Sequence, residues 1–160
     1  MLLRLFVYNF DNLFIKFKGF TMEILKAHID LIIIAILAIM AFIALYCVIE
    51  RLLFFRKVKA SAYQNIDDFD NALSENLTTL YIIYSNAPYV GLLGTVLGIM
   101  IVFYDMGLSG NIDVKSIVIG LSLALKATAL GLVVAIPSLM AYNALLRKVS
   151  LLSSKFKGER

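Results

Sequence analysis

The sequence has very little of the side-chain chemistry that enzymes and metal proteins use. It contains one cysteine and one histidine in 160 residues. Cys47 has no second cysteine to pair with, so an internal disulfide is excluded, and its place in an apolar run predicts a packing role. His28 has no cysteine or further histidine at ligand spacing, so we expect no metal site. No nucleophile–base pair and no glycine-rich phosphate loop occurs, and we expect neither a cofactor nor covalent catalysis.

Charge is also scarce, at 16% of residues, whereas 61% are hydrophobic and the mean hydropathy is +0.89. A typical soluble domain is about half apolar, so this composition predicts a membrane protein. The net charge of +4 comes from basic residues that cluster beside apolar segments. This placement favours contact with anionic lipid headgroups over binding of nucleic acid.

Residues 1–23 have the pattern of an amphipathic helix that lies in the membrane interface. One half of the helical wheel is polar: Arg4, Asn9, Asp11, Asn12, Lys16 and Lys18. The other half is apolar: Leu3, Phe6, Phe10, Leu13, Phe14 and Phe17. No compact apolar region with an A-x-A-like cleavage site is present, so we expect the segment to stay on the mature protein. A soluble helix docked on a partner is the alternative.

The first membrane span is expected at residues 24–53, around the uninterrupted apolar run Leu31–Ile49. This run has about the length needed to cross a hydrocarbon core of ~30 Å. Basic residues crowd beyond Glu50: Arg51, Arg56, Lys57 and Lys59. Cytoplasmic loops carry an excess of Lys and Arg, so this end is expected in the cytoplasm and the N-terminus on the periplasmic side.

Residues 54–85 are expected to be a cytoplasmic helical segment, within which residues 60–85 are the one long polar stretch. Asp67, Asp68 and Asp70 suggest a helix start, and we favour capping and a solvated face over a cation site because no EF-hand spacing is present. Apolar residues then recur at helical spacing: Leu73, Leu77, Leu80 and Tyr84. This helix is expected to run directly into the second span, with a kink at Pro88.

Two further spans complete the expected fold. The second covers residues 86–105, and a short periplasmic loop at 106–113 leads to the third at 114–147, with a kink at Pro137. The helical pattern of the third span continues past the membrane into a basic cytoplasmic tail at 148–160. The sequence therefore predicts an all-α integral membrane protein with three transmembrane helices, long cytoplasmic extensions of the second and third helices, and an N-terminal amphipathic helix.

Small residues form a stripe on each of the last two spans. Gly91, Gly94 and Gly98 share one helical face, with Thr95 beside them. The third span has a matching stripe, Gly120, Ala124, Ala127 and Gly131, with Thr128 on its flank. Such faces let membrane helices approach closely, so they predict helix packing and a homo-oligomer. From the second span alone, simple packing with Thr95 bonded to its own helix is an equal alternative.

The segments NAPYVGLLGTVLGIM and ALKATALGLVVAIPSLMAYN resemble the second and third membrane segments of the ExbB/TolQ/MotA proton-channel proteins, most closely ExbB. The match covers roughly the last half of the chain and joins two motifs in the right order. The resemblance implies a pentamer around two helices of an ExbD-like single-span partner. Thr95 and Thr128 match the family's pore threonines and would line a proton path.

The three expected spans carry no carboxylate at membrane depth, as read from the sequence. A hydroxyl can pass a proton along but cannot hold one, so a titratable carrier must come from another chain. The resemblance supplies one, because ExbD-like proteins contribute a membrane aspartate. The resemblance also implies that proton passage drives relative movement of the subunits, which TonB transmits to transporters of the outer membrane.

The sequence departs from the family at Leu123, where a glutamate is common in ExbB proteins. Lys126 lies nearby, close to the middle of the third span and about 200° round the helix from Thr128. A lysine there costs a few kcal/mol on insertion scales. It either forms an ion pair or titrates, or, as we favour, snorkels or donates a hydrogen bond as a neutral amine.

The leading hypothesis is an ExbB-like subunit of a motor in the bacterial inner membrane, driven by the proton-motive force, that energises TonB-dependent import. A TolQ-like role in envelope maintenance is the nearest alternative. A structural scaffold that does not conduct protons is a third.

Overall fold

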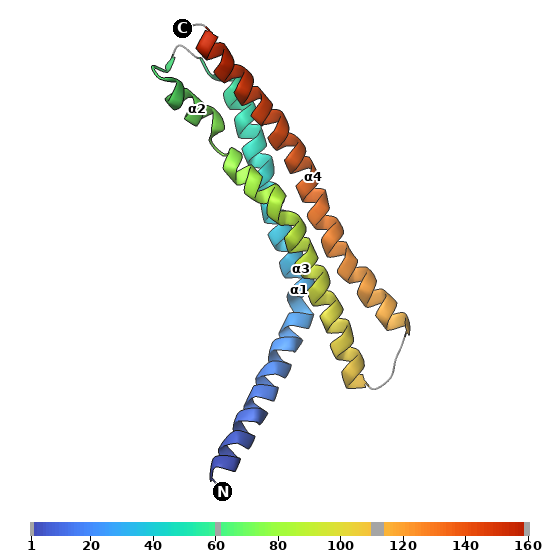
Figure 1. Ribbon diagram of the computed structural model, residues 1–160. Helices are drawn as coiled ribbons and strands as arrows, with labels where there is room; N and C mark the ends of the chain where they lie inside the picture. Colours follow the sequence, from blue (N-terminus) through green and yellow to red (C-terminus); the bar gives the residue numbers. More distant parts are fainter. Residues whose placement is uncertain (1, 60–61, 110–113, 159–160) are drawn as a thin grey trace.

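The structure is a computed structural model that describes residues 2–59, 62–109 and 114–158, with the side chains of residues 2–27, 109 and 116 outside the described part. These residues form four α-helices and no strand: α1 (Leu2–Lys57), α2 (Ile66–Ser74), α3 (Leu77–Ser109) and α4 (Val114–Gly158). Figure 1 shows α1, α3 and α4 side by side in one long bundle, with α2 at the end that holds the C-terminus.

Three stretches are long and apolar enough to cross a membrane: His28–Lys57, Ile66–Leu108 and Ile117–Gly158. Their most apolar windows have mean hydropathies of 3.1, 1.9 and 2.2. In a bilayer an α-helix satisfies its own backbone polar groups, so helices of this length and composition can span it. The protein is an all-α membrane protein, as the sequence predicts.

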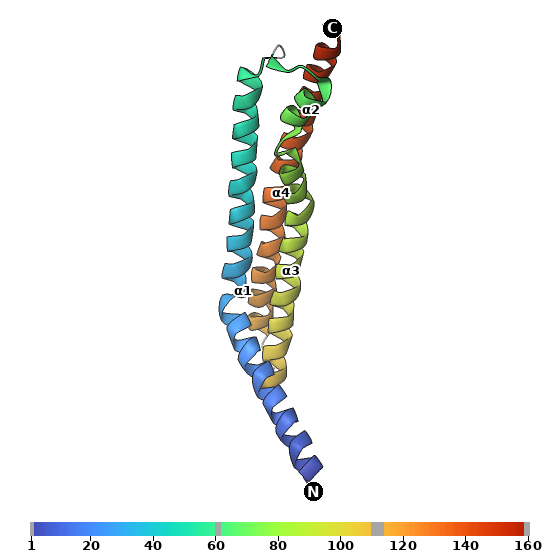
Figure 2. The same ribbon diagram turned by 90° about the vertical axis from the view of Figure 1, so that its left-hand side faces the viewer.

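The first helix is longer than either segment predicted for it. Residues 1–23 and 24–53 were expected as two elements, whereas α1 runs from Leu2 to Lys57 without a break. Its N-terminal part leaves the bundle at an angle, as Figures 1 and 2 show. The side chains that would define its amphipathic faces lie outside the described residues, so interfacial binding stays a prediction.

The polar segment after α1 forms a helix where the aspartates predict one. Asp67 and Asp68 lie in the first turn of α2, and Asn65 precedes it in extended conformation. The expectation that this helix continues directly into the membrane is wrong, because α2 ends at Ser74 and α3 begins at Leu77. Asn76 between them has a φ of 62°, a left-handed conformation that asparagine tolerates better than most residues. The chain therefore changes direction at Glu75 and Asn76, here called the elbow, before the second span.

The helix ends around this elbow enclose an apolar core. Its buried members come from all four helices: Ala44, Phe55, Phe69, Leu73, Leu77, Leu80, Ile83, Leu145 and Phe156. Leu73 and Leu80 are fully buried, which stabilises the fold by roughly 1.5–3 kcal/mol for each side chain. The rings of Phe69 and Phe156 stack with centroids 4.9 Å apart and join α2 to the end of α4.

Arg51 lies inside this end of the bundle and is 1% exposed. Sequence reasoning treated it as a membrane-edge charge. Its Nη1 donates to the Ala72 carbonyl over 2.7 Å, and its guanidinium also pairs with Glu50 at 2.5 Å and Glu75 at 3.4 Å. Asn76 Nδ2 donates to the Glu50 carboxylate over 3.1 Å. One buried side chain thus ties α1 to α2 and to the elbow.

Both prolines lie inside helices, Pro88 in α3 and Pro137 in α4, and neither ends its helix. Proline has no backbone N–H to donate, so each helix lacks one backbone hydrogen bond at its proline. Kinks at these positions remain predictions.

Candidate functional site

The α3–α4 contact is made by backbone against backbone. A Cβ atom added to Gly91 would lie 2.6 Å from the Ala127 carbonyl oxygen and 3.0 Å from the Thr128 Cα. A Cβ added to Gly131 would lie 2.6 Å from the Ala87 carbonyl oxygen and 3.2 Å from the Gly91 Cα. Only glycine fits at these two positions, because the neighbouring atoms belong to the backbone and cannot rotate away.

The other small residues continue the same contact in both directions. A Cβ on Gly98 would meet the Ala124 Cβ at 2.8 Å, and one on Gly120 would overlap the Val102 side chain. A Cβ on Gly94 would meet the Ala127 Cβ at 2.6 Å and the Ile33 Cγ2 at 3.0 Å. The first helix therefore joins the contact at the level of Gly94.

The prediction that these faces join separate copies of the chain is thereby corrected. The stripe of α3 packs against the stripe of α4 in the same chain. The link between the two helices covers only residues 110–113, so the face of α4 is available to α3 at a far higher effective concentration than a second copy could supply. Any contact between copies has to use other surfaces.

Close packing brings together the two threonines named from the sequence. Thr95 Oγ1 lies 2.5 Å from Thr128 Oγ1, where either oxygen can be the donor. Thr95 Oγ1 also lies 3.1 Å from the Ala124 carbonyl oxygen and 3.4 Å from that of Gly91. Thr128 Oγ1 lies 3.3 Å from the same Gly91 carbonyl. Sequence alone left open whether Thr95 bonds within its helix, and the structure gives it partners on both helices.

The two hydroxyl hydrogens have more acceptors within reach than they can serve at once. Each hydroxyl has one hydrogen and two lone pairs, so the pair can exchange donor and acceptor roles by rotation. Thr95 is buried, at 8% exposed, and Thr128 is partly buried. Such a pair can hand a proton from one side to the other, but a hydroxyl does not retain it.

Lys126 is exposed on a different side of α4 from the hydroxyl pair. It lines a cavity of about 150 Å³ together with Asp30, Ile34, Leu123, Ala127 and Leu130. The expectation that no acid of this chain reaches its level is wrong, because α1 brings Asp30 to the same cavity. In the sequence Asp30 directly precedes the apolar run Leu31–Ile49, and that position does not show which part of α4 lies beside it.

No group of three or more His, Cys, Asp or Glu side chains that could hold a metal ion occurs within the described ranges. His28 is exposed on α1, and Cys47 is buried as a packing residue. The polar contact that the structure shows between α3 and α4 at this site is hydrogen bonding among the two hydroxyls and the neighbouring backbone carbonyls.

Comparison with known proteins identifies a family and several relatives. Residues 55–158 match the family described as the MotA/TolQ/ExbB proton channel family. The chain is 60% identical to a biopolymer transport protein ExbB of Helicobacter pylori over 139 residues, covering 87% of this chain and 96% of the relative. It is 49% identical to an ExbB protein of Aquifex aeolicus, covering 80% and 86%, and 42% identical to one of Neisseria gonorrhoeae, covering 48% and 35%.

The matched range contains all of α2, α3 and α4, and with them both threonines of the hydroxyl pair. It also contains the close glycine contact that brings those threonines together. The family is one of channels and transport proteins rather than an enzyme class. This chain belongs to the MotA/TolQ/ExbB proton channel family.

Proposed function

We propose that the protein is the ExbB-like subunit of a motor in the bacterial inner membrane that uses the proton-motive force to energise TonB-dependent import across the outer membrane. The observation that carries the proposal is the Thr95–Thr128 hydroxyl pair, with its oxygens 2.5 Å apart between two apolar spans. Relatives at 60% and 49% identity that are named biopolymer transport protein ExbB support it.

The hydroxyl pair needs a proton carrier. A carboxylate on an ExbD-like single-span partner would supply it, entering beside α3 and α4. The protonated acid would donate to one hydroxyl, which would pass its own hydrogen to the other. The second hydroxyl would in turn give its hydrogen to water on the far side, so that both threonines stay neutral. Hydroxyls that can rotate between acceptors suit this task, because reorientation returns them to the starting state after each transfer.

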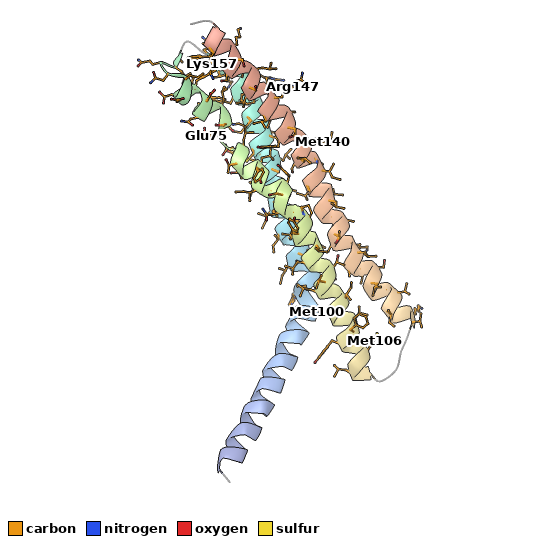
Figure 3. All side chains as sticks on the ribbon, in the orientation of Figure 1. Glu75, Met100, Met106, Met140, Arg147 and Lys157 are labelled. Atoms are coloured by element: carbon orange, nitrogen blue, oxygen red, sulfur yellow. The ribbon has the colours of Figure 1, made fainter. Side chains whose placement is uncertain are left out.

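The proposed orientation puts α2 in the cytoplasm. Figure 3 shows Arg147, Lys157 and Glu75 at the end of the bundle formed by α2, and Met106 toward the opposite end. Basic residues gather at the α2 end, as the positive-inside rule requires of a cytoplasmic end: Arg56, Lys57, Lys59, Arg147, Lys148, Lys155 and Lys157. Anionic lipid headgroups would bind these residues.

Aromatic side chains support the same boundary. The rings of Tyr84 and Tyr142 have centroids 5.3 Å apart, and Tyr81 lies 5.3 Å from Tyr84. Tyrosine is enriched where hydrocarbon meets headgroups, because its ring is apolar and its hydroxyl is polar. The Tyr81–Tyr84–Tyr142 cluster would therefore lie at the cytoplasmic interface.

A homopentamer would use the apolar side chains that one chain leaves uncovered. Those on α3 include Leu92, Leu93, Val96, Met100 and Phe103, which are between 47% and 61% exposed. With the small-residue stripes already covered, these larger residues are the available surface of α3 for contact with other copies or lipid.

The decisive experiment is complementation of a strain that lacks the chain, with two readouts. Restored TonB-dependent uptake of an iron–siderophore complex, abolished by a protonophore, supports the proposal. Restored resistance to detergent with uptake still absent would contradict it and favour a TolQ-like role. A structural scaffold predicts that uptake does not depend on the hydroxyls of Thr95 and Thr128.

A further inference from the structure

Lys126 and Asp30 lie at the same depth of the bundle. The position of Gly94 fixes the level, because a Cβ there would meet both Ala127 of α4 and Ile33 of α1. Lys126 is next to that alanine in sequence, and Asp30 lies about one helical turn before Ile33. Opposite charges on two neighbouring helices thus occupy one layer.

The cavity between them has room for water. Its volume of about 150 Å³ exceeds by several-fold the roughly 10–15 Å³ that a single ordered water needs. The other lining side chains are apolar or small, so the lysine and the aspartate are its charged groups. Asp30 directly precedes the apolar run that begins at Leu31, where water and headgroups begin, so water can enter from that side.

Among the described residues that line the cavity, Lys126 and Asp30 each have no other charged partner. Asp30 lies at the edge of the apolar run that begins at Leu31 and Lys126 lines the same cavity, and charged residues at membrane depth pair with one another or with backbone carbonyls. The usual in-helix partner is absent, since Leu123 stands one turn before Lys126. The acid that is available comes from α1 instead.

We propose that Lys126 and Asp30 form a water-bridged ion pair across the α1–α4 boundary, which holds the first span against the α3–α4 pair. A bridging water transmits nearly the full enthalpy of a direct hydrogen bond. The pair replaces the snorkelled or neutral lysine that sequence reasoning favoured. It concerns how the chain is held together and does not depend on which substrate the proposed motor serves.

A double-mutant cycle on the full chain in lipid nanodiscs tests the pair. Asp30→Asn and Lys126→Met should each lower the midpoint of thermal unfolding by a few °C, because each removes one partner of the pair from a cavity whose other lining side chains are apolar. The double variant should recover at least half of the summed loss, and the exchanged variant Asp30→Lys/Lys126→Asp should recover part of it. Losses in the double variant that simply add would overturn the proposal.

Matched controls use exposed charges elsewhere in the chain. Lys57→Met and Asp68→Asn remove the same groups from exposed positions and should leave the midpoint unchanged. If these controls lower the midpoint as much as the cavity variants do, general surface charge rather than the pair explains the effect, and the proposal fails.

A second experiment tests whether residues 30 and 126 lie close together. It does not depend on the stability of the charge variants, so it can contradict the proposal even if those variants fold poorly. In a Cys47→Ser background that also carries Asp30→Cys and Lys126→Cys, a short bifunctional thiol reagent should link the two introduced thiols within a single chain. Mass spectrometry of the linked peptides identifies the product. Links formed only between chains, or the absence of any link while each cysteine reacts singly, would overturn the proposal.

Discussion

Thr95 Oγ1 and Thr128 Oγ1 lie 2.5 Å apart, although 33 residues separate them in sequence. Their approach depends on Gly91 and Gly131, whose missing side chains let the two helix backbones come together. Packing and proposed proton transfer therefore rest on the same residues. Variants must separate the two effects, and the first two predictions do so.

Removing the hydroxyls should impair transport without loss of assembly. Thr95→Val and Thr128→Val keep the side-chain shape, so the α3–α4 contact should survive while protonophore-sensitive uptake falls at least tenfold. Thr128→Ser retains a hydroxyl and should keep most activity. The measurements are energised siderophore uptake and the yield of purified complex. Wild-type uptake in both valine variants would contradict the pore-lining role.

Adding one methyl group at Gly91 should separate the helices. Gly91→Ala places a Cβ 2.6 Å from the Ala127 carbonyl oxygen, and overpacking of this kind costs roughly 1–3 kcal/mol. The thermal midpoint in detergent should fall. Gly107→Ala on the same helix is the matched control, because a Cβ there meets nothing within 4 Å, and this variant should be neutral. Equal stability of the two variants would refute the packing assignment.

Replacing Arg51 should loosen the end of the bundle that holds α2. Arg51→Met removes the donor to the Ala72 carbonyl and the cation beside Glu50, and hydrogen bonds to charged groups contribute roughly 1.5–3 kcal/mol. We expect faster proteolysis and hydrogen exchange in α2. Arg56→Met, at an exposed position on the same helix, is the control and should behave as wild type. Identical exchange in both variants would rule out the tie between α1 and α2.

The elbow at Asn76 should discriminate between glycine and alanine. Both Asn76→Gly and Asn76→Ala lose the 3.1 Å hydrogen bond to Glu50, so their difference reports the backbone alone. A φ of 62° costs alanine roughly 1–2 kcal/mol and costs glycine almost nothing. The glycine variant should therefore have the higher thermal midpoint. The reverse order would show that the left-handed turn is not formed.

Hydropathy and periodicity determined the membrane class, the three spans and the small-residue faces. The run Leu31–Ile49 predicts a span because only its length and apolar character matter, and both are local properties. The stripe of Gly91, Gly94 and Gly98 predicts a close contact for the same reason, since helical spacing follows directly from sequence position. Leu73, Leu77 and Leu80 were likewise expected on one face and are buried together.

Only the tertiary structure decided which surfaces meet. Helical periodicity defines a face but not its partner, so the stripes could have joined two copies, and the structure pairs them within one chain. The elbow at Asn76, the burial of Arg51 and the cavity that Asp30 shares with Lys126 also depend on neighbours far away in sequence. From sequence alone, a charge at the end of a span indicates only where the span ends. Its energetic cost and its role depend on the helix that packs against it, and the sequence does not specify that helix.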